Sequence, residues 1–258
     1  MGHPKLDLTS KTAVVIGGTS GIGLALAKGL AIAGANVVPT GRRTDLIAAA
    51  AAEIEKLGRK SMVVTSDVQD RASLQAFCDA VYKEFGRVDI LVNCAGMTKR
   101  TPTVDLPEEE WTRILDINLN GTMRACQIFG RKMIEQKAGR IINIASLSSF
   151  VSLFEVAAYS TSKAAVASLT KSLAIEWAKH GICVNAIAPG VFRTELNSAL
   201  LDGTGRGKEL LMRTPMGRFG NVDELVGAAV FLASDSASFV TGHILAVDGG
   251  FLASAVNQ

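Results

Sequence analysis

The stretch Lys11-Thr-Ala-Val-Val-Ile-Gly-Gly-Thr-Ser-Gly-Ile-Gly23 decides the fold of this chain of 258 residues. Its first seven residues form a β-branched run, which predicts a short buried strand. A glycine-rich turn follows, and the apolar pattern beyond it predicts a helix to about residue 33. Glycines at 17, 21 and 23 let the backbone turn tightly and let amide groups at the helix N-terminus approach a pyrophosphate. An ordinary glycine-rich turn is the alternative, but the flanking strand and helix favour a dinucleotide site.

Strands and helices alternate along the rest of the chain. Further strands are predicted at 36–40, 60–65, 88–92, 140–145, 182–188 and 243–247. Helices are predicted at 44–57, 70–85, 108–136 with an interruption near Asn120-Gly121, 158–179 and 222–233. This alternation predicts βαβ units and a parallel sheet. With no linker or repeat in sight, we expect a single Rossmann-type, doubly wound α/β domain over 1–258. Its mostly parallel sheet would have about seven strands flanked by helices.

The composition excludes several classes of protein. Hydrophobic residues make up 48% and charged residues 20% of the chain, which suits a soluble α/β core. No apolar run approaches the roughly 20 residues of a membrane span, and no apolar signal core opens the chain, so we expect a cytoplasmic protein. The net charge of +3 is too mild to indicate nucleic acid. The four cysteines lack a CxxC pair and the three histidines are scattered, so no metal site is expected.

Tyr159 and Lys163 are four residues apart on a predicted helix, so both side chains would lie on one face. A phenol titrates near pH 10 in water, and an ammonium one turn away is expected to lower that pKa. Ser146 follows a predicted buried strand and could point its hydroxyl into the same cleft. Together these groups could move a proton on or off a carbinol oxygen. A lone Tyr-x-x-x-Lys usually carries no function, so this interpretation depends on the rest of the chain.

The pattern Tyr159-Ser-Thr-Ser-Lys163, with Ser146 thirteen residues upstream, resembles the active site of the short-chain dehydrogenase/reductase family. Other motifs follow in that family's order from residue 11 to Gly250. The resemblance implies strand order 3-2-1-4-5-6-7, a homotetramer, and hydride transfer between a nicotinamide cofactor and a carbonyl or secondary alcohol. It implies that Tyr159 is the general acid in reduction and the base in oxidation, that Lys163 lowers its pKa and holds the nicotinamide ribose, and that Ser146 hydrogen-bonds the substrate oxygen.

The segment Leu115-Asp-Ile-Asn-Leu-Asn-Gly121 holds the candidate for the family's fourth catalytic residue, an asparagine that interrupts a helix and completes the proton relay. The resemblance assigns this role to Asn118. Asn120 is the rival by composition, and the spacing to Gly121 favours Asn118.

The residues after the second strand bear on the choice of cofactor. An acidic residue there would bind the ribose 2′-hydroxyl, but this chain has Gly41-Arg42-Arg43. Arg42 can form charge-assisted hydrogen bonds to a 2′-phosphate, with Arg43 as its helper. The sequence therefore predicts NADP(H) rather than NAD(H). The alternative is that both arginines are solvated residues at the start of a helix.

The resemblance implies further cofactor contacts. The glycine turn matches the family's G-x-x-x-G-x-G form, although Ile16 stands where the family usually has Thr. Asp67 would cap the adenine amino group, with a turn or helix cap as the alternative. Val191 and Thr194 would hold the nicotinamide carboxamide. In full, the expected cofactor contacts besides Arg42 and Arg43 are Gly17, Thr19, Ser20, Gly21, Ile22, Gly23, Asp67, Val68, Asn93, Ala95, Gly96, Tyr159, Lys163, Pro189, Gly190, Val191 and Thr194.

The substrate is indicated less directly. The C-terminal third resembles the family's sugar-acid and polyol branch, which includes gluconate 5-dehydrogenases, and Lys99 and Arg100 could attract an anion or belong to a solvated loop. Against that branch, Phe150, Leu153 and Phe154 would give the cleft an apolar wall. Residues from about 192 to 213 are expected to form an irregular, flexible lid that excludes water, or merely a long surface loop. The alternatives are a 3-oxoacyl thioester (acyl carrier protein) reductase and a catalytically silent dinucleotide-binding regulator.

Overall fold

The computed structural model describes residues 3–194 and 198–255, and their strands form one parallel sheet in the order β2-β1-β3-β4-β5-β6. The strands are β1 Thr12–Ile16, β2 Asn36–Thr40, β3 Ile90–Asn93, β4 Gly139–Ile144, β5 Ile182–Pro189 and β6 Ile244–Val247. All five pairings are parallel. The prediction of a doubly wound α/β fold is confirmed. The described strands number six rather than seven.

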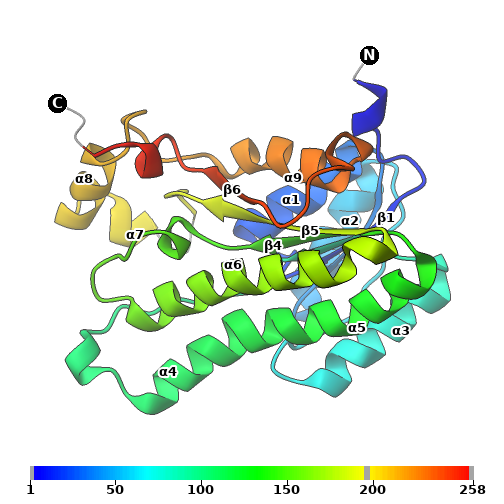
Figure 1. Ribbon diagram of the computed structural model, residues 1–258, viewed down its shortest axis with the longest axis horizontal. Coiled ribbons are helices and arrows are strands. Elements are labelled where there is room, and N and C mark those ends of the chain that lie inside the picture. The colour runs from blue at the N-terminus through cyan, green and yellow to red at the C-terminus, as the bar shows by residue number, and fades with distance from the viewer. Residues whose placement is uncertain (1–2, 195–197, 256–258) are drawn as a thin grey trace.

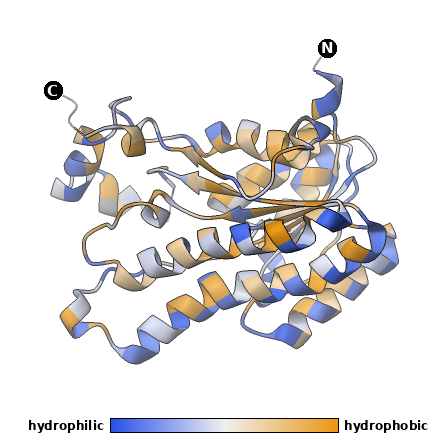
Figure 2. Cartoon of the chain, in the orientation of Figure 1, coloured by the Kyte–Doolittle hydropathy of each residue, from blue (hydrophilic) through white to orange (hydrophobic). Residues whose placement is uncertain are grey.

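Helices cover both faces of this sheet (Figure 1). They are α1 Gly21–Ile32, α2 Thr44–Lys56, α3 Arg71–Phe85, α4 Glu108–Leu115, α5 Gly121–Gln136, α6 Ala157–Trp177, α7 Ser198–Leu201, α8 Gly205–Met212 and α9 Val226–Ala233. One apolar layer joins the sheet to α1, α2 and α9, and a second joins it to α3, α5 and α6. Figure 2 shows hydrophobic residues concentrated on the strands and on the helix faces toward them. Because both faces are covered, the strands are continuous apolar runs, as in β1.

The predicted third strand at 60–65 is wrong, and Pro39 of β2 explains why. The segment runs beside β2, where the Val37 amide donates to the Lys60 carbonyl at 3.1 Å. In a parallel ladder the next donor on that side of β2 would be residue 39, which as proline has no N–H. Ser61 instead donates its hydroxyl to the Val37 carbonyl at 2.8 Å. The segment therefore follows the sheet edge without forming a ladder. The observed strand order equals the expected order 3-2-1-4-5-6-7 with the predicted third strand removed.

Helices α4 and α5 are joined by a π-helical turn over Asp116–Asn120, so the predicted interruption near Asn120-Gly121 is confirmed. Such turns widen the helix by one residue and are frequent at functional sites. Arg124 fixes this turn, because its Nη2 lies 2.7 Å from Asp116 Oδ1 and its Nη1 donates to the Val68 carbonyl at 3.0 Å.

Helices α7 and α8 lie beyond the end of the sheet where the chain leaves β5 (Figure 1). The expected irregular lid is therefore helical over much of 198–212, while residues 195–197 lie outside the described part. Leu201 and Leu210 anchor these helices in a small apolar cluster with Leu147 and Phe251. Short 3-10 turns complete the fold at Pro4–Leu6, Thr103–Asp105, Leu147–Ser149, Ala178–His180, Val222–Leu225, Asp235–Ala237 and Phe251–Ala253. A search of the described residues found no helix with the length and apolar character to cross a membrane.

Candidate active site

The four predicted catalytic residues come from three elements at the carboxyl end of the sheet. Asn118 lies on the π turn, Ser146 is the second residue after β4, and Tyr159 and Lys163 lie on the first two turns of α6. Asn118 is fully buried, Ser146 and Lys163 are 7% and 6% exposed, and Tyr159 is half-buried. Ser146 has an extended backbone and caps the turn at Leu147–Ser149, where its hydroxyl accepts from the Ser148 amide at 3.1 Å.

Lys163 is a buried cation that is tied to the sheet. Its Nζ donates to the Ile144 carbonyl at 2.6 Å and lies 5.7 Å from the centre of the Tyr159 ring. Burial lowers the pKa of Lys163 to about 8, because a low-dielectric site disfavours the charged form. This ammonium can therefore gain or lose a proton close to neutral pH.

The Tyr159 phenol has a pKa above its usual value of 10, chiefly because burial disfavours the phenolate. The Ser146 hydroxyl acts in the opposite direction by hydrogen-bonding the phenol, and Cys94 adds to the increase. The net shift of the phenol pKa is therefore upward, opposite to the decrease expected from Lys163, because burial prevails. The phenol is therefore protonated at neutral pH.

Asn118 locks the loop after β3 to α6. Its Oδ1 accepts from the Met97 amide at 2.8 Å, and its Nδ2 donates to the Met97 carbonyl and to Ser162 Oγ, both at 2.9 Å. A Cβ atom on Gly96 would lie 3.3 Å from Asn118 Oδ1 and 3.6 Å from Lys163 Nζ. Gly96 thus lies close to both residues, and a side chain there would require Asn118 to shift by a few tenths of an ångström. The rival Asn120 instead donates to Asp116 on its own turn at 3.2 Å.

The glycine turn after β1 closes against two other segments. Gly17 has φ +79°, and a Cβ there would lie 2.6 Å from the Ala95 amide nitrogen. A Cβ on Gly23 would lie 2.0 Å from the Gly17 carbonyl oxygen, and one on Gly21 would lie 3.7 Å from Thr194 Cγ2. Three segments predicted to bind cofactor therefore meet at one edge. Pro189 ends β5, and Gly190 and Val191 follow it toward Thr194.

The start of α1 is suited to a phosphate group. Ser20 occupies the cap position, but its side chain makes no capping hydrogen bond to the first amides of α1. Such amides and the helix dipole bind anions. The space left open because these glycines have no Cβ, together with the uncapped amides, fits the diphosphate of a dinucleotide.

The turn after β2 carries positive charge. Arg42 and Arg43 are both exposed, and neither forms an ion pair with another described residue. Gly41 faces Thr19 of the glycine turn, because a Cβ there would lie 3.5 Å from Thr19 Oγ1. This arrangement leaves two guanidinium groups free to pair with a phosphate beside the glycine turn.

Three other predicted cofactor residues have structural partners. Asp67 accepts from the Gln69 amide at 3.0 Å, which is the turn that the sequence offered as its alternative. Val68 packs against Gly121, where a Cβ would lie 2.7 Å from the valine Cβ. The Asn93 side chain points into the sheet and donates to Asn143 Oδ1 at 2.8 Å. A cofactor contact at Asn93 would therefore come from its backbone.

Lys99 and Arg100 are not free cations. Lys99 pairs with Glu110, and Arg100 Nε lies 2.5 Å from Glu155 Oε2. The sequence analysis missed Glu155, and it missed Arg206 of α8, whose Nη1 donates to the Phe154 carbonyl at 3.1 Å. No local pattern could have signalled these contacts, since they join residues about 50 positions apart.

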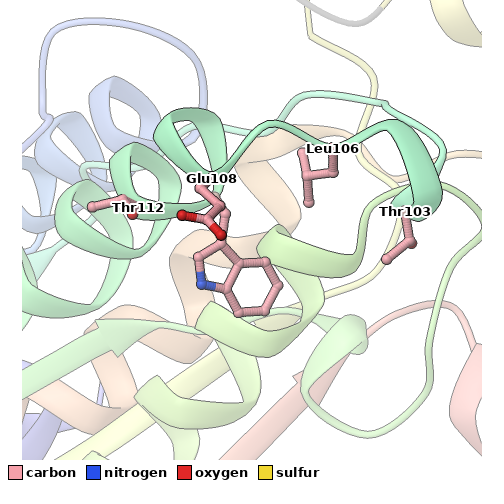
Figure 3. A pocket seen from close by; sticks show the side chains of 5 residues that line it. Thr103, Leu106, Glu108 and Thr112 are labelled. Carbon is pink, nitrogen blue, oxygen red and sulfur yellow. The ribbon is translucent and has the colours of Figure 1, made fainter.

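An open hollow of about 410 Å³ lies between the turn at Thr103–Asp105 and α4 (Figure 3). Its lining residues are Thr103, Leu106, Glu108, Trp111 and Thr112. None of them belongs to the predicted tetrad or to the glycine turn, so this hollow is not the predicted cofactor cleft.

Known proteins match nearly the whole chain. A family model described as enoyl-(acyl carrier protein) reductase matches residues 17–252. The 2-dehydro-3-deoxy-D-gluconate 5-dehydrogenase of Bacillus subtilis is 44% identical over 252 residues, which is 97% of this chain and 98% of that protein. The D-threitol dehydrogenase of Mycolicibacterium smegmatis is 42% identical over 244 residues, or 95% of this chain and 94% of that protein.

Solved structures share the whole fold. A gluconate 5-dehydrogenase from Burkholderia cenocepacia, crystallised in complex with NADP and tartrate, has a TM-score of 0.94 and 40% identity over 97% of this chain and 98% of that chain. With the sheet order and the clustered tetrad described above, these matches over nearly the full length show that the chain belongs to the short-chain dehydrogenase/reductase family.

Proposed function

We propose that this protein catalyses reversible hydride transfer between NADP(H) and a secondary alcohol or ketone of a sugar acid or polyol. The observation that carries the proposal is the convergence of Asn118, Ser146, Tyr159 and Lys163 beside the glycine turn. A dinucleotide-binding regulator without chemistry needs none of these four residues. The relatives named above are dehydrogenases of sugar acids and of a polyol, which supports the substrate class.

The cofactor would lie across the carboxyl ends of the strands. The amides at the start of α1 would hold its diphosphate, and Arg42 with Arg43 would hold the 2′-phosphate that distinguishes NADP. The similar structure crystallised with NADP supports this choice. Val191 and Thr194 would hold the carboxamide end. When bound, the nicotinamide supplies or accepts the hydride.

Tyr159 would move the proton. Because burial raises the pKa of its phenol, the phenol is protonated at neutral pH and can donate to the substrate oxygen during reduction. The Ser146 hydroxyl, which already hydrogen-bonds the phenol, would also bind that oxygen as charge develops on it. In oxidation the same proton returns to Tyr159. Lys163, with a pKa of about 8, would favour the phenolate when it is charged, and Asn118 would connect it to solvent.

The substitution Tyr159→Phe tests the mechanism. We expect a loss of about 10²–10⁴-fold in turnover, because the variant lacks the acid and base, while NADPH binding is unchanged. Activity is measured as NADPH consumption with 5-ketogluconate, and binding as NADPH fluorescence. The control is Tyr82→Phe on α3, since Tyr82 is the only other tyrosine in the chain. Full activity of Tyr159→Phe would disprove the assigned role.

An acetoacetyl thioester in the same assay tests the rival function. Turnover of the thioester without turnover of 5-ketogluconate would favour a 3-oxoacyl thioester reductase, which acts on acyl chains. The homotetramer that the family resemblance implies and the cytoplasmic location expected from the sequence stay predictions.

A further inference from the structure

Helix α8 directs one positively charged side chain toward the active site. Arg206 is partly buried and donates from Nη1 to the Phe154 carbonyl at 3.1 Å. Leu210 is one turn further along α8, hence on the same face, and packs in the cluster that contains Leu147. Leu147 directly follows Ser146. The face of α8 that carries Arg206 therefore points toward the residues proposed to bind the substrate oxygen.

A second guanidinium reaches the same segment from the loop after β3. Arg100 pairs with Glu155, and its guanidinium carbon lies 6.0 Å from the centre of the Phe154 ring. Phe154 and Glu155 precede Tyr159 by five and four residues. Two arginines from distant parts of the chain thus converge just before the helix that carries the tyrosine.

The charges in this group do not balance. The charged side chains that act on Arg206 are Arg100, Glu155 and Glu209, and Glu209 also faces Arg213 at 3.8 Å. Three cations therefore share two carboxylates among these described residues. Burial and the nearby Arg100 both lower the pKa of Arg206, as expected for guanidinium groups held close together. An additional carboxylate would complete the group.

The backbone of Glu155 adopts an unfavourable conformation where its carboxylate pairs with Arg100. Its φ of +62° is unusual for a residue with a side chain, and the Thr101 amide holds it through a 2.9 Å bond to the Glu155 carbonyl. Strained residues of this kind cluster at ligand sites. The carboxylate occupies the place beside Arg100 that an anionic substrate would also favour.

We propose that Arg206, with Arg100, binds the carboxylate of a sugar-acid substrate, and that Arg206 is the residue that discriminates sugar acids from neutral polyols. This inference rests on the proposed function and deepens it. In the absence of the anion Glu155 pairs with Arg100. The positive charge of Arg206 is then the one that the substrate carboxylate neutralises. A guanidinium suits this role because its planar fork can bind a carboxylate through two hydrogen bonds.

The test compares the oxidation of D-gluconate and of neutral D-threitol by NADP+ in wild type, Arg206→Gln, Arg206→Lys and Lys208→Gln. We expect Arg206→Gln to raise the KM for gluconate by about tenfold or more, because a charged hydrogen bond is lost, while the KM for threitol stays within about twofold. Arg206→Lys should recover part of the affinity. Lys208 is an exposed cation on the same helix, so Lys208→Gln should match wild type for both substrates.

Equal changes of KM for both substrates in Arg206→Gln, or no change for either, would overturn the inference while the proposed function stands. If wild type oxidises neither substrate, the proposed function fails. The inference is then decided by calorimetric binding of D-gluconate to the enzyme with NADP+. Weaker binding to Arg206→Gln than to Lys208→Gln would support it, and equal binding to both variants would overturn it.

Discussion

Lys163 shows how a single residue couples stability to chemistry. Its ammonium is almost completely buried and donates to a strand carbonyl rather than to a carboxylate. A buried cation without a carboxylate destabilises the fold, and the lowered pKa of about 8 expresses that cost. In the proposed mechanism this cost has a function, because a lysine that titrates near neutral pH would assist proton transfer by Tyr159.

The pH dependence of stability follows from this lowered pKa. Between about pH 8 and 10.5 the unfolded chain keeps a proton on Lys163 that the folded chain has lost, so stability from this group rises with pH. The variant Lys163→Met lacks this pH-dependent contribution to the unfolding free energy. From pH 7 to pH 10 we expect the unfolding free energy of wild type to gain on the order of 2 kcal/mol relative to the variant. Denaturant titrations at both pH values measure this, and a constant difference would contradict the lowered pKa.

At the scale of elements, the glycine turn depends on the contact between two loops. Gly17 and Gly58 have nearly equal φ angles, +79° and +75°, but a Cβ on Gly58 would have no atom within 4 Å. Both Gly→Ala variants should lose about 1–2 kcal/mol because alanine disfavours this conformation. Gly17→Ala must also displace the backbone at Ala95, so we expect it alone to weaken NADPH binding by more than about tenfold. Fluorescence titration and thermal unfolding check both; equal NADPH affinities of the two variants would contradict this account.

Two elements differ from the sequence prediction for reasons outside the local pattern. The segment 60–65 has strand composition, but its neighbour Pro39 lacks the N–H that the ladder needs. Residues 198–212, rich in glycine, form α7 and α8 because Leu201 and Leu210 pack on Leu147 and Phe251. In both cases a neighbour distant in sequence decided the local conformation.

For the whole molecule, exposed apolar side chains bear on assembly. Ile175 on α6 is 82% exposed and Phe239 before β6 is fully exposed. The family resemblance implies a homotetramer joined through the long helices and the C-terminal strand region, the two regions in which these residues lie. We expect light scattering to give a mass near four times 27.1 kDa. Ile175→Asp should lower that mass, because it would bury a charge at the interface. Val104→Asp changes a residue that is also exposed but lies outside both regions, so this variant should not lower the mass. A monomeric wild type would rule out the tetramer.

The family resemblance implied the order of the strands, and the sequence by itself determined the class of fold and the local motifs. It could do so because parallel strands, phosphate turns and the Tyr159–Lys163 spacing are set by residues close along the chain. It also selected Asn118, whose position on a π turn fits a residue that interrupts a helix.

Only the tertiary structure decided the electrostatics of the site. Burial raised the pKa of Tyr159 where spacing to Lys163 predicted a lower one, since desolvation depends on everything packed around a group. The pairing of Lys99 with Glu110 and of Arg100 with Glu155, and the approach of Arg206, were equally invisible in the sequence. These contacts join separate loops and a helix, and they exist only because the sheet brings its carboxyl ends to one edge.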